Sequence, residues 1–307
     1  MAQPSSHALV VAVNPTSGKG KAKKLAEETV DAFRGRGFTV DVIVCGSDGE
    51  LRSALRRRLD NPHGALIVVG GDGMVHTALQ VLMDHPDTPL GIVPAGTGND
   101  IARAVGMDQA NPLSAVDNIV RSLGSGPRRI DLGEARHGDV VSRFGAVYSA
   151  GFDALVNERA NQLRFPRGTS RYTVAMLLEL STLTARSYRL TVDNHCYEQE
   201  ALLVAVANAE SFGGGMRIVP DTAIDDGVLQ VFTVAPLGRG SFVKLYPKVF
   251  SGSHLDHPAV TIRPAQSVRI EVDDIVGYAD GERVGPLPVD IRVLPGILPV
   301  LAEAPGF

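Results

Sequence analysis

The chain has 307 residues and a formal net charge of −4, with 44% hydrophobic and 21% charged residues. This length exceeds one typical domain core, so two domains are expected, and the composition is that of an ordinary folded protein. The slightly acidic balance excludes the strong basic field with which proteins bind duplexes, so no nucleic-acid partner is expected.

Cysteine usage and hydropathy indicate a cytoplasmic protein. The two cysteines, Cys45 and Cys196, lie far apart and lack metal-type spacing, which argues against a disulfide framework or a zinc site. The apolar run from Ala8 to Val13 is too short for a signal sequence or a membrane span, and no later run reaches spanning length. We therefore expect no transmembrane segment.

Residues 1–127 alternate strand-like and helix-like segments, which predicts an α/β domain built on a parallel sheet. Ligand-binding loops of such a domain lie at the carboxyl edge of the sheet. Strands are predicted at 9–13, 40–44, 65–69 and 90–93, and helices at 21–34, 50–59, 74–83, 99–104 and 113–123.

The pattern changes after Gly124-Ser125-Gly126-Pro127. Residues 128–294 hold many short strand-like runs separated by turns, which predicts an antiparallel sandwich or barrel. The runs are 129–132, 141–150, 188–192, 201–207, 228–234, 259–262, 267–272 and 288–293, with helices at 154–163, 170–185 and about 241–250. The apolar tail, 295–307, is not placed by the sequence, and a return to the first domain is one option.

The most informative stretch is Gly70-Gly71-Asp72-Gly73, between a β-branched apolar run and a predicted helix. Its glycines can take positive φ and bring backbone N–H groups close to an anion, and the helix would point its N-terminus at the same place. The acid at Asp72 suggests a magnesium ion or a hydroxyl proton beside phosphates. The alternative is a tight turn with Asp72 as the N-cap of the helix.

Two further loops follow strands of the same domain. Asn14-Pro15-Thr16-Ser17-Gly18-Lys19-Gly20 offers hydroxyls, glycines and a lysine at a helix start, but it is not a P-loop and equally fits a capping turn. Pro94-Ala95-Gly96-Thr97-Gly98-Asn99-Asp100 lacks the last glycine of a dinucleotide fingerprint, which disfavours a Rossmann site.

In this order and at this separation, the three motifs resemble those of the diacylglycerol kinase-like lipid kinases of bacteria, which are related to sphingosine and ceramide kinases. The resemblance spans nearly the whole chain. In the second domain it continues through Asn208 to Met216, Pro220-Asp221-Thr222-Ala223, Asp225-Asp226-Gly227 and Asp280-Gly281-Glu282. It implies a nucleotide-binding α/β domain like that of NAD kinase and phosphofructokinase, followed by a lipid-binding antiparallel β-sandwich.

The resemblance also implies an ATP site on the three loops. The glycine-rich loop would hold the ATP phosphates, and Cys45 falls at a position that is often threonine in the family. The implied nucleotide contacts are Asn14, Pro15, Ser17, Gly18, Cys45, Gly70, Gly71, Asp72, Gly73, Met74, Val75, His76, Thr97, Gly98 and Asn99.

Metal and proton roles are implied in the same way. A structural magnesium ion would be bound by Asp226 with the carbonyls of Ala223 and Val228. Glu282 corresponds to the base that takes the proton from the lipid hydroxyl. Asp280 and Asp72 would lie with Glu282 near the phosphates and share a catalytic magnesium ion. In isolation, however, Asp280-Gly281 and Asp226-Gly227 also fit plain hairpin turns.

The helix after the glycine-rich loop departs from the family pattern. Met74, His76 and Thr77 stand where the family usually has a threonine and then an acid or asparagine. His76 could assist phosphate binding, whereas a lone helical histidine is more often a partly buried polar residue.

The lipid side is expected around the helices predicted at 154–163 and 170–185. Arg164, Arg167 and Arg171 surround Phe165 and Pro166, which would suit an anionic bilayer surface. The alternative is a solvated face over a buried helix. We expect a lipid partner, peripheral contact with the inner face of the membrane, and an oligomeric state left open, with a homodimer among the options.

The leading hypothesis is therefore an ATP- and Mg²⁺-dependent kinase that phosphorylates a lipid hydroxyl, most simply converting diacylglycerol to phosphatidic acid. NAD kinase, which shares a Gly-Gly-Asp-Gly loop, is the alternative enzyme. A non-catalytic lipid- or nucleotide-binding relative is the alternative outside enzymes.

Overall fold

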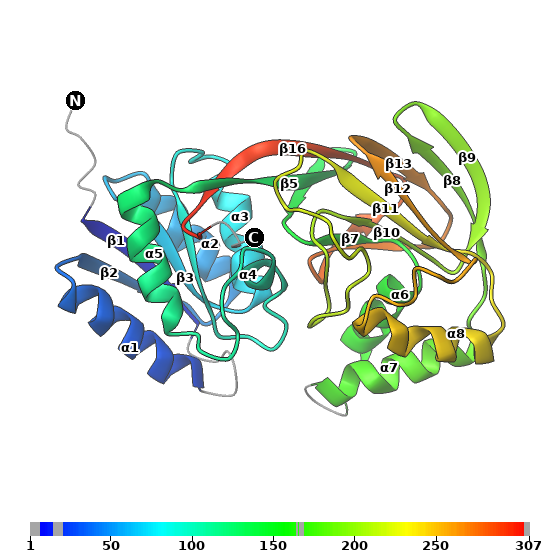
Figure 1. Cartoon of the computed structure of the whole chain (residues 1–307), viewed down its shortest axis with the longest axis horizontal. Coiled ribbons are helices and arrows are strands. Elements are labelled where there is room, and N and C mark those ends of the chain that lie inside the picture. Colours follow the sequence, from blue (N-terminus) through cyan, green and yellow to red (C-terminus); the bar gives the residue numbers. More distant parts are fainter. Residues whose placement is uncertain (1–6, 15–20, 164, 166–168, 304–307) are drawn as a thin grey trace. The chain divides into compact units, whose positions relative to one another are not determined.

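The structure, a computed structural model, describes residues 7–14, 21–163, 165 and 169–303 (Figure 1). The chain divides into two compact units. The first unit consists of residues Met1–Asp131 together with Pro295–Phe307, and the second of Leu132–Leu294. Two strands, β5 (Arg128–His137) and β16 (Val289–Val300), run through the points where the chain passes from one unit to the other.

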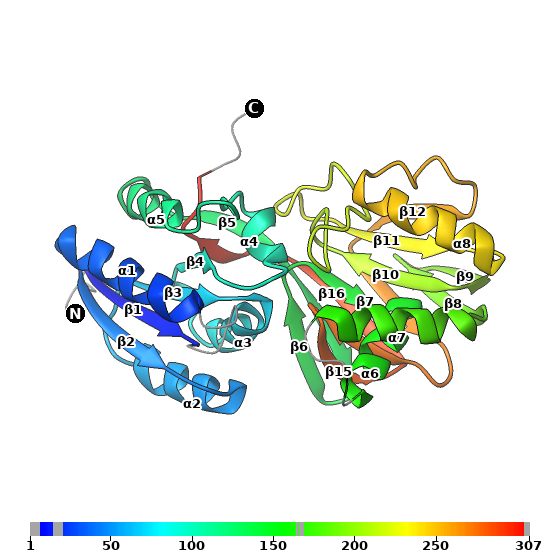
Figure 2. The same ribbon diagram turned by 90° about the horizontal axis from the view of Figure 1, so that it is seen from below.

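The first unit is built on four parallel strands in the order β2-β1-β3-β4. Helices α1 and α5 cover one face of these strands, and α2 and α3 cover the other (Figure 2). The strands are β1 (Ala8–Val13), β2 (Thr39–Val44), β3 (Ala65–Gly70) and β4 (Leu90–Pro94). The helices are α1 (Lys21–Gly35), α2 (Asp48–Leu59), α3 (Asp72–Leu82), α4 (Asp100–Ala104) and α5 (Ser114–Ser125).

Burial explains why the sequences of β3 and β4 are almost entirely apolar. Every residue of β3 and of β4 is buried, because helices cover both faces of the sheet. Among the described strands, β2 pairs only with β1, and it is partly exposed, with Val44 64% accessible to solvent. The end of β16 returns to this unit, where Val300 pairs in parallel with Leu90 and the N–H of Leu301 donates to the Leu90 carbonyl.

The second unit is an antiparallel β-sandwich. One sheet contains β6-β5-β16-β13-β8-β9, and the other has the order β12-β11-β10-β7-β14-β15. The strands not yet given are β6 (Val140–Phe144), β7 (Val147–Ser149), β8 (Arg186–Val192), β9 (His195–Ala201), β10 (Leu203–Ala207), β11 (Leu229–Val234), β12 (Val260–Ala265), β13 (Ser267–Glu271), β14 (Val276–Ala279) and β15 (Glu282–Pro286).

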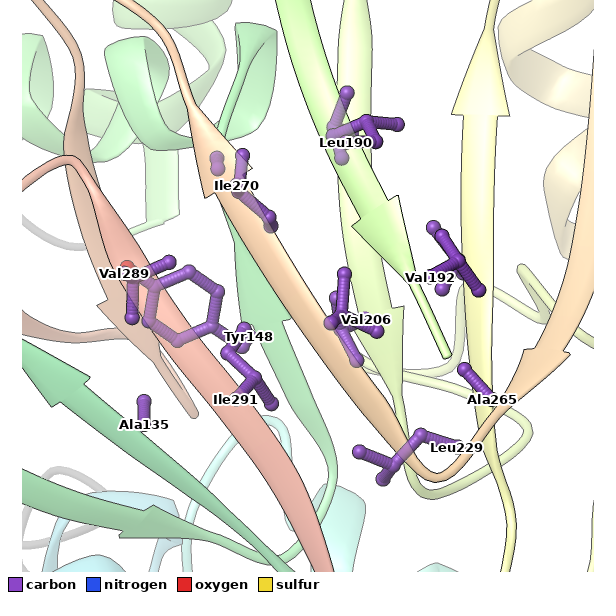
Figure 3. Packing of buried hydrophobic residues seen from close by; sticks show 14 of the residues in the cluster. Ala135, Tyr148, Leu190, Val192, Val206, Leu229, Ala265, Ile270, Val289 and Ile291 are labelled. Carbon is purple, nitrogen blue, oxygen red and sulfur yellow. The ribbon is translucent and has the colours of Figure 1, made fainter. Parts of the chain in front are cut away.

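The core of the sandwich lies between its two sheets. Leu190, Ile270 and Val289 from one sheet pack with Tyr148 and Val206 from the other (Figure 3). All of these side chains are at most 1% exposed, which is the burial expected of facing strands whose alternate residues point inward.

Helices cover the second sheet of the sandwich on its outer side (Figures 1 and 2). They are α6 (Phe152–Gln162), α7 (Thr169–Ser181) and α8 (Arg239–Leu245), followed by the 3-10 helix η2 (Tyr246–Phe250). Phe152 of α6, Leu202 and Phe242 of α8 form a small buried cluster with Met176 and Leu180 of α7 packed against it. No helix among the described residues is long and apolar enough to cross a membrane.

The predicted fold class, a parallel α/β part followed by an antiparallel β-sandwich, is confirmed, but several boundaries were wrong. The single run predicted at 141–150 is two strands, β6 and β7, interrupted at Gly145-Ala146. The helix predicted at 170–185 ends at Ser181, and β9, β14 and β15 were not predicted as strands. These strands are short or carry many polar residues, so their apolar alternation is weak.

Candidate active site

The loops singled out from the sequence of the first unit all leave the carboxyl edge of its parallel sheet. Val13 at the end of β1 pairs with Val44 of β2 and with Val69 of β3, and Gly70 pairs with Pro94 at the end of β4. Asn14, Cys45, Gly71 and Ala95 therefore begin side by side. Pro15, Ser17 and Gly18 of the first motif lie outside the described residues.

The second and third loops touch through their glycines. A Cβ atom on Gly71 would lie 3.0 Å from the Gly96 Cα, and a Cβ on Gly96 would lie 2.5 Å from the Gly71 Cα. Real Cβ atoms do not come as close to backbone as 2.5 Å, so a larger residue at Gly96 would separate the loops, and one at Gly71 would make a tight contact with Gly96. The N–H of Ala95 also donates to the Gly70 carbonyl over 2.9 Å.

Asp72 joins the same two loops through its carboxylate. Its Oδ2 accepts from the Asn99 N–H at 2.7 Å and its Oδ1 from the Asp100 N–H at 2.6 Å, at the start of α4. Asn99 has a left-handed backbone with φ of 53°, and its Oδ1 accepts from the Gly96 N–H at 2.8 Å. The carboxylate thus satisfies amide donors at a helix start that have no partner within the helix.

The alternative interpretation, in which Asp72 is the N-cap of its own helix, is wrong. The helix α3 begins at Asp72 itself, two residues before the predicted start, and Gly71 is its N-cap without a capping side chain. The expected part of Asp72 in metal binding stays a prediction.

The residues expected to contact the nucleotide differ in their exposure to solvent. Met74, Val75 and His76 are buried in α3, with the His76 ring 3.4 Å from the Gln80 amide nitrogen, whereas Gly73 and Thr97 are exposed. A ligand at this edge could reach Gly73 and Thr97 directly. The buried site of His76 agrees with the interpretation as a core polar residue, and its assistance to phosphate binding stays a prediction.

Cys45 directly follows β2 and is 7% exposed. Its N–H donates to the Val13 carbonyl at 3.1 Å. Burial, and then the negative charge of Glu50, raise the pKa of the Cys45 thiol, so this side chain presents a neutral S–H to the site rather than a thiolate.

In the second unit, Asp280 and Gly281 form the turn between β14 and β15. Both have positive φ, 50° and 86°, as the two central residues of a type I′ hairpin turn require. The Asp280 carboxylate accepts from the N–H groups of Gly145 and Ala146 at 2.8 Å each and of Val147 at 3.1 Å. Asp280 therefore anchors the turn to the interruption between β6 and β7.

Glu282 differs from Asp280 although only one residue separates them. It is the exposed first residue of β15, and among the described residues no hydrogen bond or ion pair holds its carboxylate. Its carboxylate is thus available to a substrate. Asp72 belongs to the first unit and Asp280 and Glu282 to the second, so the expected clustering of the three stays a prediction.

The residues of the predicted structural metal site occupy a turn before β11. Asp226 Oδ1 accepts from the Val228 N–H at 2.9 Å, and Gly227 between them has φ of 75°. A carboxylate with the backbone carbonyls of Ala223 and Val228 is an all-oxygen donor set, which fits Mg²⁺. Within the described ranges, no group of three or more histidine, cysteine or acidic side chains is placed to hold a metal ion, so such a site would depend on these carbonyls.

The hydrogen bonds that hold these residues were not predicted from the sequence. Asn208, fully buried after β10, donates from Nδ2 to the Gly145 carbonyl at 2.9 Å and so supports the loop that binds Asp280. The Gly145–Val147 amides carry no side-chain signal. Only the glycine that breaks the run 141–150 could have pointed to them.

A cavity of about 410 Å³ lies in the second unit beside α6 and α7. Leu155 and Leu183 contribute apolar surface to it, and Glu158 contributes a carboxylate. Arg159 and Glu179 also line it and form an ion pair, with Nε and Oε1 2.6 Å apart. The cavity therefore offers both apolar and polar walls.

Comparison with known proteins places this arrangement in a family. The model of the diacylglycerol kinase catalytic domain matches residues 8–135, and that of the YegS C-terminal NAD kinase beta sandwich-like domain matches residues 145–302. A protein of Mycobacterium tuberculosis named diacylglycerol kinase is 39% identical over 95% of this chain and 94% of its own length. The chain belongs to the diacylglycerol kinase family.

More distant proteins named diacylglycerol kinase are also similar to this chain in sequence or fold. The diacylglycerol kinase of Bacillus subtilis is 24% identical over 90% of this chain and 89% of its own length. A crystal structure of a diacylglycerol kinase from Bacillus anthracis, 21% identical, covers 97% of both chains with a TM-score of 0.73 and shows the shared fold. The predicted family is confirmed, and the chain is a lipid kinase of this family.

Proposed function

We propose that this member of the diacylglycerol kinase family transfers the γ-phosphoryl group of ATP to the free hydroxyl of diacylglycerol and releases phosphatidic acid. The observation that carries the choice of acceptor is the 39% identity, over 95% of the chain, to the protein of Mycobacterium tuberculosis named diacylglycerol kinase.

The ATP side of the proposal rests on the carboxyl edge of the first unit. Gly73 and Thr97 are exposed there, and α3 begins without a capping side chain, so its N-terminus can face phosphate oxygens. Asp72 holds the two loops at a fixed separation through the Asn99 and Asp100 amides. Bound Mg²⁺ would supply neutralisation of phosphate charge.

Glu282 is the proposed acceptor of the hydroxyl proton. Its carboxylate is exposed and no described residue holds it, whereas Asp280 beside it is occupied by amide donors. A carboxylate can accept the proton if it lies within hydrogen-bond reach of the hydroxyl in the substrate complex.

The lipid side of the proposal rests on the helices of the second unit. We name as the helical surface the exposed apolar residues of α7, α8, η2 and the segments beside them, which are Phe165, Tyr172, Leu177, Leu178, Val243, Phe250 and Leu255. Seven of the ten exposed large apolar residues of the described chain are in this set. Such a concentration is typical of a membrane or protein contact.

Exposed basic residues lie on the same helices as part of the helical surface. Arg239, Lys244 and Lys248 lie on α8 and η2, where they could meet anionic lipid headgroups. We propose that this surface contacts the inner face of the membrane peripherally and that the acceptor lipid reaches the cavity beside α6 and α7. Arg164 and Arg167, which entered the same expectation, lie outside the described residues.

The test is phosphoryl transfer by the purified full chain. With labelled ATP and Mg²⁺, we expect label in phosphatidic acid when mixed micelles contain diacylglycerol, and none in NADP when NAD is the acceptor. Sphingosine, ceramide and a total lipid extract, each in a parallel reaction, would reveal another lipid acceptor. Turnover of NAD alone would overturn the proposal, and nucleotide binding without any transfer would favour a non-catalytic relative.

A further inference from the structure

The β14–β15 hairpin, which carries Glu282, is held at its turn by Asp280. The Asp280 carboxylate accepts from three consecutive amides, Gly145 to Val147, and the Asp280 N–H donates back to the Val147 carbonyl at 2.9 Å. This anchor fixes the turn itself. It does not contact the side chains of the two residues one step behind the turn, Tyr278 on β14 and Arg283 on β15.

A second anchor acts on those residues from α6. Glu158 Oε2 accepts from the Tyr278 hydroxyl at 2.7 Å and from the Arg283 Nε at 3.2 Å. Tyr278 and Arg283 are directly paired across the hairpin, with Tyr278 on β14 and Arg283 adjacent to Glu282 on β15. One carboxylate therefore holds both strands one step behind the turn.

This anchor is buried on the side of Tyr278, whereas the Glu158 and Arg283 side chains are 32% and 52% exposed. Tyr278 is 1% exposed, and its hydroxyl also receives a hydrogen bond from Asn161 Nδ2 at 3.3 Å. The Tyr278 hydroxyl, more than the Arg283 guanidinium, holds the pKa of the Glu158 carboxyl below its usual value. Glu158 is thus charged at neutral pH, and hydrogen bonds to a charged acceptor are the stronger kind.

The hairpin needs such support because its pairing is irregular. The register shifts between Gly277 and Tyr278, directly behind the step that Glu158 holds. A β-bulge of this kind breaks the ladder and lets the end of a hairpin change direction. Without Glu158, the hairpin would be tied to the sandwich by Asp280, by the backbone pairing of Tyr278 and Ala279 with β7, and by the β14–β15 ladder on either side of the irregularity. The side chain of Arg283 on β15 would then have no anchor to the sandwich in this set.

Glu158 also faces the cavity beside α6 and α7, where it is one of the lining residues. Tyr278 and Arg283 do not line that cavity. A ligand in the cavity would therefore meet the same carboxylate that holds the hairpin.

We propose that Glu158 is a positioning residue for phosphoryl transfer, which holds the Tyr278–Arg283 step and so directs the carboxylate of Glu282 toward the acceptor hydroxyl. This inference rests on the proposed function, because it takes Glu282 as the base. It assigns to α6 a part in catalysis without contact with the reacting atoms.

The test compares Glu158→Ala, Tyr278→Phe and the double variant with the unchanged protein. Each single variant should lower kcat on diacylglycerol micelles about tenfold, because a misdirected base loses much of its effect. Tyr278→Phe removes only a hydroxyl outside the cavity, so its KM for the lipid should stay within about twofold. The double variant should be no worse than the poorer single one, since both break one anchor.

A role in directing the base and a purely structural role predict different results in a protein that already lacks the base. In Glu282→Gln protein, adding Tyr278→Phe should leave the residual rate unchanged, because there is no base left to direct. A further loss of rate there would overturn the inference. The control is Glu198→Gln, which alters an exposed glutamate paired with Arg189 on the β8–β9 ladder and should leave kcat and KM as they were.

Hydrogen exchange provides a readout that needs no substrate. Glu158→Ala and Tyr278→Phe should both speed exchange of the amides at 279–284, while amides of β13 stay protected. Unchanged exchange would overturn the anchor even if the kinase is active, and faster exchange with unchanged kcat would overturn its part in catalysis. If the unchanged protein phosphorylates no lipid, the proposed function fails, and with it the catalytic part, whereas exchange still decides the anchor.

Discussion

At the scale of residues, the carboxylates predicted for one active site differ in what surrounds them. Asp72 and Asp280 each accept from backbone amides with both oxygens, whereas no described residue binds Glu282. Acids that hold loops together and an acid that is exposed to substrate are expected to respond differently to the same substitution.

Glu282→Gln should therefore reduce turnover to a small residual rate without changing stability. Loss of a general base lowers rates by about two to four orders of magnitude, and an exposed side chain without partners contributes little to folding. Kinase assays with thermal melting would check both parts. Activity near that of the unchanged protein would refute the assigned base.

Asp280→Asn, in contrast to Glu282→Gln, should change the stability of the protein. An amide NH₂ would face a backbone N–H where a carboxylate oxygen now accepts, so we expect a loss of about 1 to 3 kcal/mol in the free energy of unfolding. Chemical denaturation would measure it. A variant as stable as the unchanged protein would contradict the role of Asp280 as the anchor of the turn.

A buried acid outside the site, Asp153 in the first turn of α6, makes stability depend on pH. No described residue meets its carboxylate in hydrogen-bond geometry. Burial raises the pKa of Asp153 to about 6, although the Ser149 hydroxyl and the amides of the first helical turn oppose the shift. The folded chain thus binds this proton more tightly than the unfolded chain, where the pKa is about 4.

The sign of the effect follows from that difference. Stability from the Asp153 proton is fully present below about pH 4 and is lost as the pH rises through about 6, by roughly 3 kcal/mol in all. Asp153→Asn should remove this part of the pH dependence and be the more stable protein at about pH 8. Melting curves of both proteins across this range would check it, with exposed Asp139→Asn as the control. Parallel curves for Asp153→Asn and the unchanged protein would contradict the prediction.

At the scale of elements, α7 presents apolar side chains on two sides. Met176 and Leu180 pack toward Phe152 and Phe242, while Leu177 and Leu178 are 56% and 44% exposed. A helix that is apolar beyond one stripe is expected to bury its second side against something else, and a bilayer is the proposed partner here.

Replacing Leu177 and Leu178 by aspartate should weaken binding to vesicles. We expect the unchanged protein to sediment with phosphatidylcholine vesicles that contain phosphatidylglycerol, and the double variant to remain in the supernatant. Val140→Asp, at an equally exposed valine of β6, should sediment as before. Equal binding by all three proteins would argue against the helical surface.

At the scale of the whole molecule, the first unit depends on the end of the chain. Leu298, Val300 and Leu301 are at most 1% exposed, although the whole of the second unit precedes them in sequence. The core of the first unit is therefore complete only when the last strand has been made.

Leu301→Ala should lower the free energy of unfolding by about 2 to 5 kcal/mol, the range for emptying a buried leucine site. Glu303→Ala, two residues on, removes an exposed partner of Arg121 and should leave stability little changed. Urea unfolding of both variants would check this. Equal stability of the two would contradict the assignment of the tail to the first core.

Much of the parallel sheet and the family could be predicted from the sequence. Runs such as Ala65 to Val69 are apolar throughout because helices bury both faces of their sheet, and glycine loops are recognisable because backbone must approach backbone, as at Gly71 and Gly96. In the second unit the strands β9, β14 and β15, which are short or carry many polar residues, were missed, because pairing partners rather than their own alternation stabilise them.

The sequence by itself determined the family, the two-part architecture, and the acids and glycines from which a phosphate site can be built, since these depend on local spacing and residue type. Only the tertiary structure decided what each acid contacts. Asp72 meets amides 27 and 28 positions away, and Asp280 meets amides more than 130 positions away. Such partners are backbone groups, which every residue possesses, so no sequence pattern distinguishes them until the fold brings them within hydrogen-bond reach.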